Sequence, residues 1–258
     1  KETKNAFSLK EIIQKIEHHH NASQESKNIA SALFKAASTW GIFSDSSSGT
    51  KILELISPGT TTILDTSIYS SIGAYNIRAM VINIVCRRLF QSRMDARKKE
   101  ELQAIEHGQE YLSYKMQRDE PLIWIFIDEA HEFLPKNEKT PATDSLIQLL
   151  REGRQPGISL VLATQQPGQI HRDAMTQSDI VLAHRVTAKP DIEALNEIMQ
   201  SYLLENIQKQ MNNLPSQKGS AIILDDNSER IYPIRVRPRF TWHGGEAPVA
   251  IKAELKFD

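Results

Sequence analysis

Two adjacent carboxylates, Asp128 and Glu129, directly follow an unbroken apolar run at residues 122–127. Such a run is typical of a strand covered on both faces, as in a parallel α/β sheet. Open α/β sheets bind ligands at the carboxyl ends of their strands. There, one carboxylate can hold Mg²⁺ while a second orients and deprotonates an attacking water. The pair predicts nucleoside-triphosphate hydrolysis, with Asp128 as the Mg²⁺ ligand and Glu129 as the base. The alternative is a buried strand that ends in an acidic turn or helix start.

A second apolar run, at residues 158–163, follows Gly157 and ends in Thr164 and Gln165. A polar group just past a strand that neighbours the first one can sense the γ-phosphate of a bound nucleotide. We expect Gln165 to have this role and Thr164 to assist it. The alternative is that Thr164 and Gln165, considered apart from the neighbouring strand, form only a polar turn.

The remaining periodic segments predict a mixed α/β chain. A capping-box pattern begins at Ser8, where Glu11 follows three residues later. Helices are expected at 7–18, 26–40, about 72–93, 143–150 and 190–212, and strands at 60–64, 179–183, 219–224 and 229–236. The 72–93 helix should continue as a polar segment that projects into solvent.

Composition excludes several classes of protein. The 31 basic and 32 acidic residues nearly cancel, so bulk charge does not indicate a nucleic-acid or membrane partner. The single cysteine, Cys86, excludes an internal disulfide framework and is expected to be a buried apolar residue. No apolar stretch has the length of a membrane span and no signal peptide is visible, so we expect a cytoplasmic protein without membrane contact.

The ordered motifs resemble the HerA-like branch of the HerA/FtsK ATPases, which are hexameric DNA-translocating motors. The matching stretches lie between Pro58 and Gly245 and read PGTTTILDTS, IDEAHEFLP, LREGRQPGISLVLATQQP, IVLAHRVTAKPDIEAL, LPSQKGSAIIL and RPRFTWHGG. The resemblance implies a RecA-like P-loop NTPase core with a mainly parallel central sheet. We expect three parts: a helical insertion subdomain at 1–50, the ATPase core at 51–236 and a C-terminal arm at 237–258.

The resemblance also implies a function and partners. We expect a homohexamer that uses ATP and Mg²⁺ to translocate double-stranded DNA, with a NurA-like nuclease or another effector, in DNA end processing or anti-phage defence. Arg154 would act as an arginine finger on a neighbouring subunit's nucleotide, with Arg151 as the competing candidate. The alternative for Arg154 is a surface ion pair with Glu152 or another acid.

The sequence departs from this family in one respect, because it contains no G-x-x-x-x-G-K-[ST] phosphate-binding loop. We expect that segment to lie upstream of Lys1, so that this chain alone is inactive; the alternative is its loss in evolution. The DEAH letters also suggest a superfamily-two helicase, but the arginine motif comes too early for that class. Two other functions stay open: a non-catalytic ring scaffold for an effector, and a DNA-binding module that uses the basic, aromatic tail.

Overall fold

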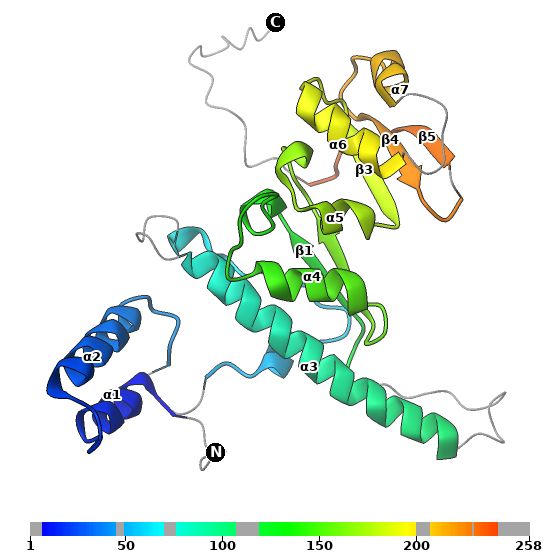
Figure 1. Ribbon diagram of the computed structural model, residues 1–258. Coiled ribbons are helices and arrows are strands. Elements are labelled where there is room, and N and C mark those ends of the chain that lie inside the picture. Colours follow the sequence, from blue (N-terminus) through cyan, green and yellow to red (C-terminus); the bar gives the residue numbers. More distant parts are fainter. Residues whose placement is uncertain are drawn as a thin grey trace, which may run out of the picture. The chain divides into compact units, whose positions relative to one another are not determined.

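The computed structural model describes residues 7–44, 49–69, 76–106, 119–199, 207–228 and 230–241 (Figure 1). The chain divides into two compact units, Lys1–Ser178 and Asp179–Asp258, and each is described by itself. The division into three parts at residues 50 and 236 stays a prediction. Most of the predicted C-terminal arm, from residue 242 onward, lies outside the described residues.

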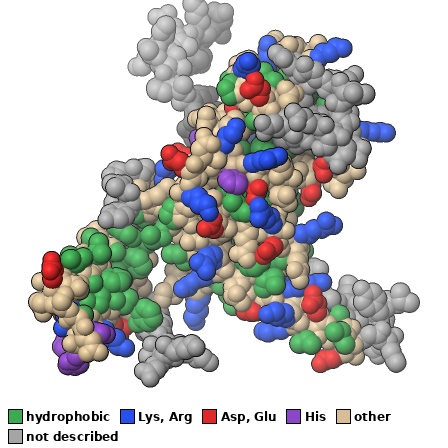
Figure 2. Space-filling model, viewed as in Figure 1, with side chains coloured by type: hydrophobic (Ala, Val, Ile, Leu, Met, Phe, Trp, Pro, Cys, Tyr) green, Lys and Arg blue, Asp and Glu red, His purple; other side chains and the backbone are tan. Residues whose placement is uncertain are grey.

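The first unit begins with two helices that pack on each other, α1 (Leu9–Glu17) and α2 (Gln24–Ser38). The capping box is confirmed: Ser8 Oγ accepts from Glu11 N at 3.3 Å, and Glu11 Oε2 accepts from Ser8 N at 2.7 Å. Apolar side chains gather on this helical pair in Figure 2. Ile29 and Leu33, one helical turn apart on α2, are both exposed.

A parallel pair of strands forms the centre of the first unit. Strand β1 (Ile123–Ile127) pairs with β2 (Ile158–Leu162) in a register that sets Ile123 opposite Ile158 and Ile127 opposite Leu162. Parallel strands need a crossover between them, and here it contains helix α4 (Thr143–Glu152). The predicted parallel α/β arrangement is therefore confirmed for these two strands, and their carboxyl ends lie at one edge.

One apolar core joins these strands to helices α3 (Ile77–Glu106) and α4. Ala79, Cys86 and Leu89 of α3, with Leu146 and Leu149 of α4, pack with Ile123, Ile127 and Ile158. Cys86 is 2% exposed, and burial raises the pKa of its thiol to about 12, as expected for a packing residue. Helix α3 runs 13 residues beyond the predicted core segment, and the predicted start at 72–75 lies outside the described residues. A short helix, α5 (Arg172–Thr176), follows β2 and was not predicted.

The expectation that β1 is covered on both faces is wrong within the described residues. Trp124 and Phe126 are 65% and 71% exposed and stack on each other, whereas Ile123 and Ile127 are buried. Successive strand residues point to opposite faces, so the helices cover one face only. An unbroken apolar run gives a strand two apolar faces. It does not show what covers the second face.

The predicted strand at residues 60–64 is not formed. Its residues make no ladder, Ile63 is 85% exposed, and Thr62 Oγ1 donates to Leu55 O at 2.7 Å. This segment and β1 line a common cavity of about 990 Å³. Residues 60–64 therefore do not pair with β1 as a neighbouring strand. A β-branched run becomes a strand only where another strand supplies hydrogen-bond partners. Before this segment, Ile52–Glu54 form a 3-10 turn.

The second unit is an antiparallel sheet in the order β3–β4–β5, with β3 at Ile180–His184, β4 at Ser220–Asp225 and β5 at Arg230–Arg235. The predicted strands at 219–224 and 229–236 are confirmed as β4 and β5. Helices α6 (Lys189–Met199) and α7 (Ile207–Asn213) account for the predicted 190–212 helix, and residues 200–206 between them lie outside the described residues. Among the helices that the structure describes, none is long and apolar enough to cross a membrane.

A buried arginine holds the segments that lead into β1 and β2. Arg93 of α3 is 1% exposed; its Nε donates to Pro156 O at 2.8 Å, and its Nη1 donates to Glu120 O at 3.1 Å and to Glu100 Oε1 at 3.2 Å. The adjoining Gly157 has a φ of 80°, and an added Cβ there would overlap the Leu122 side chain. A close approach at this end of the strands thus depends on Arg93 and Gly157 together.

Replacing Arg93 should destabilise the first unit strongly. We expect Arg93→Ala to lower the free energy of unfolding by about 3–5 kcal/mol, because Glu100 and two carbonyls lose their buried partner. The control is Lys139→Ala in the same unit, whose exposed pair with Asp144 should contribute about 0–1 kcal/mol. Urea unfolding followed by circular dichroism measures both variants. Equal effects would show that the buried cluster contributes no more than a surface pair.

Candidate active site

Glu129 adopts an unusual backbone conformation directly after β1. Its φ of 47° and ψ of 47° are left-handed, and it is the only non-glycine residue with positive φ in the described part of the chain. For a residue with a Cβ this conformation costs roughly 1–2 kcal/mol. Two hydrogen bonds between the segments that end β1 and follow β2 hold the backbone on both sides of it: Ala163 N donates to Ile127 O and Ala130 N donates to Ala163 O, both at 2.9 Å. Such strain is typical of functional sites.

This backbone turn brings Glu129 to the residues that follow β2. Gln165 Nε2 donates to Glu129 Oε1 at 2.5 Å, although the two residues are 36 positions apart. Asp128 is exposed beside them, and its Oδ1 accepts from Glu129 N at 2.9 Å. The structure therefore brings Asp128, Glu129 and Gln165 together at the carboxyl edge of the parallel pair.

His131 and Thr164 complete this cluster. Thr164 Oγ1 lies 2.9 Å from His131 Nδ1 and accepts from Gln166 N at 3.0 Å. His131 Nδ1 also lies 3.5 Å from Glu129 Oε2. The predicted assistant Thr164 is thus in the site, whereas His131 was missed. Its position three residues after the first acid was a signal, since the 3-10 turn Ala130–Glu132 returns its side chain toward β2.

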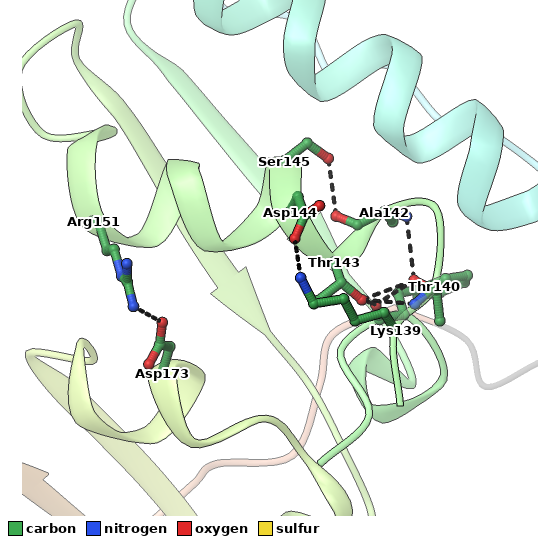
Figure 3. Close-up of polar contacts among 9 residues, drawn as sticks. Lys139, Thr140, Ala142, Thr143, Asp144, Ser145, Arg151 and Asp173 are labelled. Carbon is green, nitrogen blue, oxygen red and sulfur yellow. Dashed lines mark hydrogen bonds and ion pairs between the residues drawn. The ribbon is translucent and has the colours of Figure 1, made fainter. Parts of the chain in front are cut away.

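A polar network holds the loop between β1 and α4 (Figure 3). The hydroxyls of Thr140 and Thr143 donate to Phe133 O at 2.7 and 3.1 Å, and Thr143 Oγ1 accepts from Thr140 N at 2.9 Å. Thr143 is fully buried. Helix α3 also contacts this loop: Arg78 pairs with Glu132 at 2.8 Å and lies over the Phe133 ring. Sequence reasoning also missed Arg78, because its partner is 54 residues away.

The two candidate arginine fingers differ in their surroundings. Arg151 at the end of α4 forms an ion pair with Asp173 of α5, with 2.6 Å between Nη2 and Oδ2 (Figure 3). Arg154 is exposed, and no described residue forms a hydrogen bond or ion pair with its side chain. Both precede β2, whereas Glu129 follows β1, so the five-residue strands place about 16 Å between them. Neither arginine is therefore brought to Glu129 within one chain.

The residues at the carboxyl edge fit a magnesium ion held jointly with a nucleotide. Mg²⁺ is usually bound by one or two carboxylates together with phosphates and waters. Asp128 offers an exposed carboxylate with one oxygen already oriented by Glu129 N. A protein-only cage is not available, because the described residues contain no group of three His, Cys, Asp or Glu that could hold an ion.

Part of the chain is similar to known proteins. The family model described as zonular occludens toxin (Zot) matches residues 72–190. A probable DNA double-strand break repair helicase HerA of Methanocaldococcus jannaschii is 29% identical over 102 residues, which is 40% of this chain and 20% of that protein. A probable helicase of the same organism is 31% identical over 104 residues, again 40% of this chain and 20% of that protein.

The chain thus matches about a fifth of the length of these relatives. A solved structure, the genome packaging NTPase B204 of Sulfolobus turreted icosahedral virus 2 with ATP-γS, is also similar. It has 17% identity and a TM-score of 0.45, and the similarity covers 72% of this chain and 71% of that one. The sequence matches to HerA helicases confirm the resemblance inferred from the motifs: this chain contains a HerA-like segment.

The left-handed backbone of Glu129 can be tested by protein stability, without an activity measurement. Glu129→Gly should exceed Glu129→Ala in free energy of unfolding by about 1 kcal/mol, because only glycine adopts this φ without strain. The matched control is Gln148, exposed within α4, where alanine should exceed glycine by about 1 kcal/mol. Urea unfolding of the four variants measures both differences. If alanine is the more stable choice at both positions, Glu129 is not held left-handed.

Proposed function

We propose that the chain is part of a HerA-type, DNA-translocating ATPase. The observation that carries this proposal is the Glu129–Gln165 hydrogen bond, which joins the ends of two parallel strands beside the exposed Asp128. A base, a metal-binding acid and an amide donor at one sheet edge are the groups that nucleotide hydrolysis requires. The names of the HerA relatives supply the second part, action on DNA.

Each group has a distinct proposed role. Glu129 accepts the proton of the attacking water, and the Gln165 amide, with Thr164 beside it, donates to the γ-phosphate. Asp128 would hold Mg²⁺, which when bound neutralises phosphate charge. Because Gln165 now occupies Glu129 Oε1, nucleotide binding would redirect the amide toward phosphate and leave that oxygen available to water.

The β- and γ-phosphates also need a cradle, and the sequence contains no Walker A motif. Backbone amides and a lysine normally supply that cradle. We therefore propose that a Walker A segment from outside these 258 residues completes the site.

The 258-residue chain by itself should hydrolyse ATP negligibly, and a chimaera that joins it to the Walker A segment of a HerA relative should hydrolyse it. Glu129→Gln in the chimaera should retain ATP binding but slow turnover by about 10²–10⁴-fold, because an amide cannot accept the proton. Phosphate release and nucleotide binding are measured in parallel. Turnover by the unextended chain that Glu129→Gln abolishes would refute the need for the segment. A binding-competent chimaera without turnover would favour a non-catalytic scaffold.

The finer proposal is a homohexameric ring in which Arg154 acts across a subunit interface. Arg154 is exposed, without a described partner, and at the opposite strand ends from Glu129, so it can serve only a neighbour's nucleotide. Arg151 is the weaker candidate because Asp173 holds it. The guanidinium fork suits the spread charge of the transferred phosphoryl group. Duplex DNA in the channel and a NurA-like nuclease or defence effector complete this proposal.

Mixing inactive subunits tests the proposed ring. Arg154→Ala and Glu129→Gln chimaeras should each be nearly inactive, since a finger is worth roughly 10³–10⁵ in rate in GTPases. In equimolar mixed rings, about a quarter of the interfaces pair an intact Glu129 with a neighbour's intact Arg154, so about a quarter of the activity should return. Arg172→Ala, another exposed arginine, is the control. Mixed rings without recovery, or full activity of Arg154→Ala alone, would refute the assignment.

A DNA-binding role of the arm has one supporting observation. Arg237 lies 3.9 Å from the centroid of the Phe240 ring, and Phe240 is 89% exposed. An exposed aromatic ring beside a guanidinium suits stacking on bases and contact with phosphates. This role would add to translocation if duplex binding weakens steeply with salt and requires Arg237, and would replace it if binding needs no nucleotide and hydrolysis is absent.

A further inference from the structure

One oxygen of the proposed base lacks a hydrogen-bond partner. Glu129 Oε1 accepts from Gln165, whereas Oε2 is buried and accepts no hydrogen bond from the residues that the structure describes. A buried carboxylate oxygen left in this state is energetically costly. His131 Nδ1, a possible donor, lies 3.5 Å from Oε2. The His131 side chain is 17% exposed, so water does not surround it.

The contacts of His131 Nδ1 determine which ring nitrogen carries the proton. Thr164 Oγ1 lies 2.9 Å from Nδ1 and already accepts from Gln166 N, which leaves it one lone pair for a second donor. A proton on Nδ1 would point between that lone pair and Glu129 Oε2. Without it, the nitrogen lone pair would face a carboxylate oxygen, which is repulsive. The surroundings therefore favour the Nδ1–H tautomer.

The backbone that carries His131 is fixed independently of its side chain. Ala130 N donates to Ala163 O at 2.9 Å, and Leu134 N donates to Ala130 O at 2.9 Å. Glu132, which directly follows His131, pairs with Arg78 at 2.8 Å. The imidazole is therefore directed toward Thr164 and Glu129 by a rigid turn. A side chain so placed can orient another without contacting the substrate.

We propose that His131 is a positioning residue for Glu129. Its Nδ1–H, anchored on Thr164, holds the Oε2 side of the carboxylate while Gln165 holds Oε1. When Gln165 turns to a bound phosphate, His131 keeps the carboxylate oriented toward the attacking water. This inference rests on the proposed function for its catalytic consequence, whereas the hydrogen-bond arrangement can be tested without it.

Long-range ¹H–¹⁵N correlation spectra of the 258-residue protein test the arrangement directly. We expect the pyrrole-type shift on Nδ1 of His131 and the pyridine-type shift on Nε2, assigned by its loss in His131→Asn. Thr164→Val should change this pattern, and Thr164→Ser, which keeps the hydroxyl, should preserve it. A proton on Nε2 in the unmodified protein, or no response to Thr164→Val, would overturn the proposal.

Kinetics of the Walker A chimaera test the consequence. His131→Leu should lower kcat by about tenfold or more with little change in KM for ATP, because the base is misoriented while nucleotide contacts remain. His131→Asn should recover most of kcat, since its amide places an N–H near Nδ1, whereas His131→Gln places one near Nε2 and should not. Equal losses in all three variants would refute positioning. If the unmodified chimaera never hydrolyses ATP, the proposed function fails, and the spectra still decide the hydrogen bond.

Discussion

The parallel pairing of β1 with β2 is the interaction on which the rest of the structure depends. Its register aligns Ile127 with Leu162, and two further hydrogen bonds, through Ala163, extend the pairing past both strands. Glu129 and Gln165 are therefore neighbours because each follows a strand by two or three residues. A slip of one residue would turn every side chain of the strand to the opposite face and separate the two.

Both ends of this pair are held by polar groups rather than by apolar packing alone. Arg93 joins the two segments that enter the strands, and Thr140 and Thr143 hold the loop that leaves β1. These ties explain how the chain sustains a left-handed Glu129 and a buried, unpaired carboxylate oxygen. Each feature lowers stability, and a surrounding structure that fixes the backbone prevents relaxation.

The geometry separates the proposed chemical groups into two sets. Asp128, Glu129 and Gln165 lie at the carboxyl edge, and Arg151 and Arg154 precede β2 at the amino edge. A single chain cannot bring the two sets to one phosphate across the length of a strand. An assembly in which the amino edge of one copy meets the carboxyl edge of the next would do so, and a head-to-tail interface of that kind gives a ring if the rotation between copies closes and a filament if it does not.

The sequence by itself determined the elements with strong local signals. The apolar runs and the acids after them predicted β1, β2 and the positions of Asp128, Glu129 and Gln165, and Ser8 with Glu11 predicted the start of α1. Tertiary contacts alone decided the rest. Residues 60–64 have strand composition but no ladder partner, and Trp124 and Phe126 are apolar yet exposed. His131, Arg78 and Arg93 act through partners 33, 54 and 63 residues away, and local periodicity carries no information about such pairs, because only the folded chain brings them into contact.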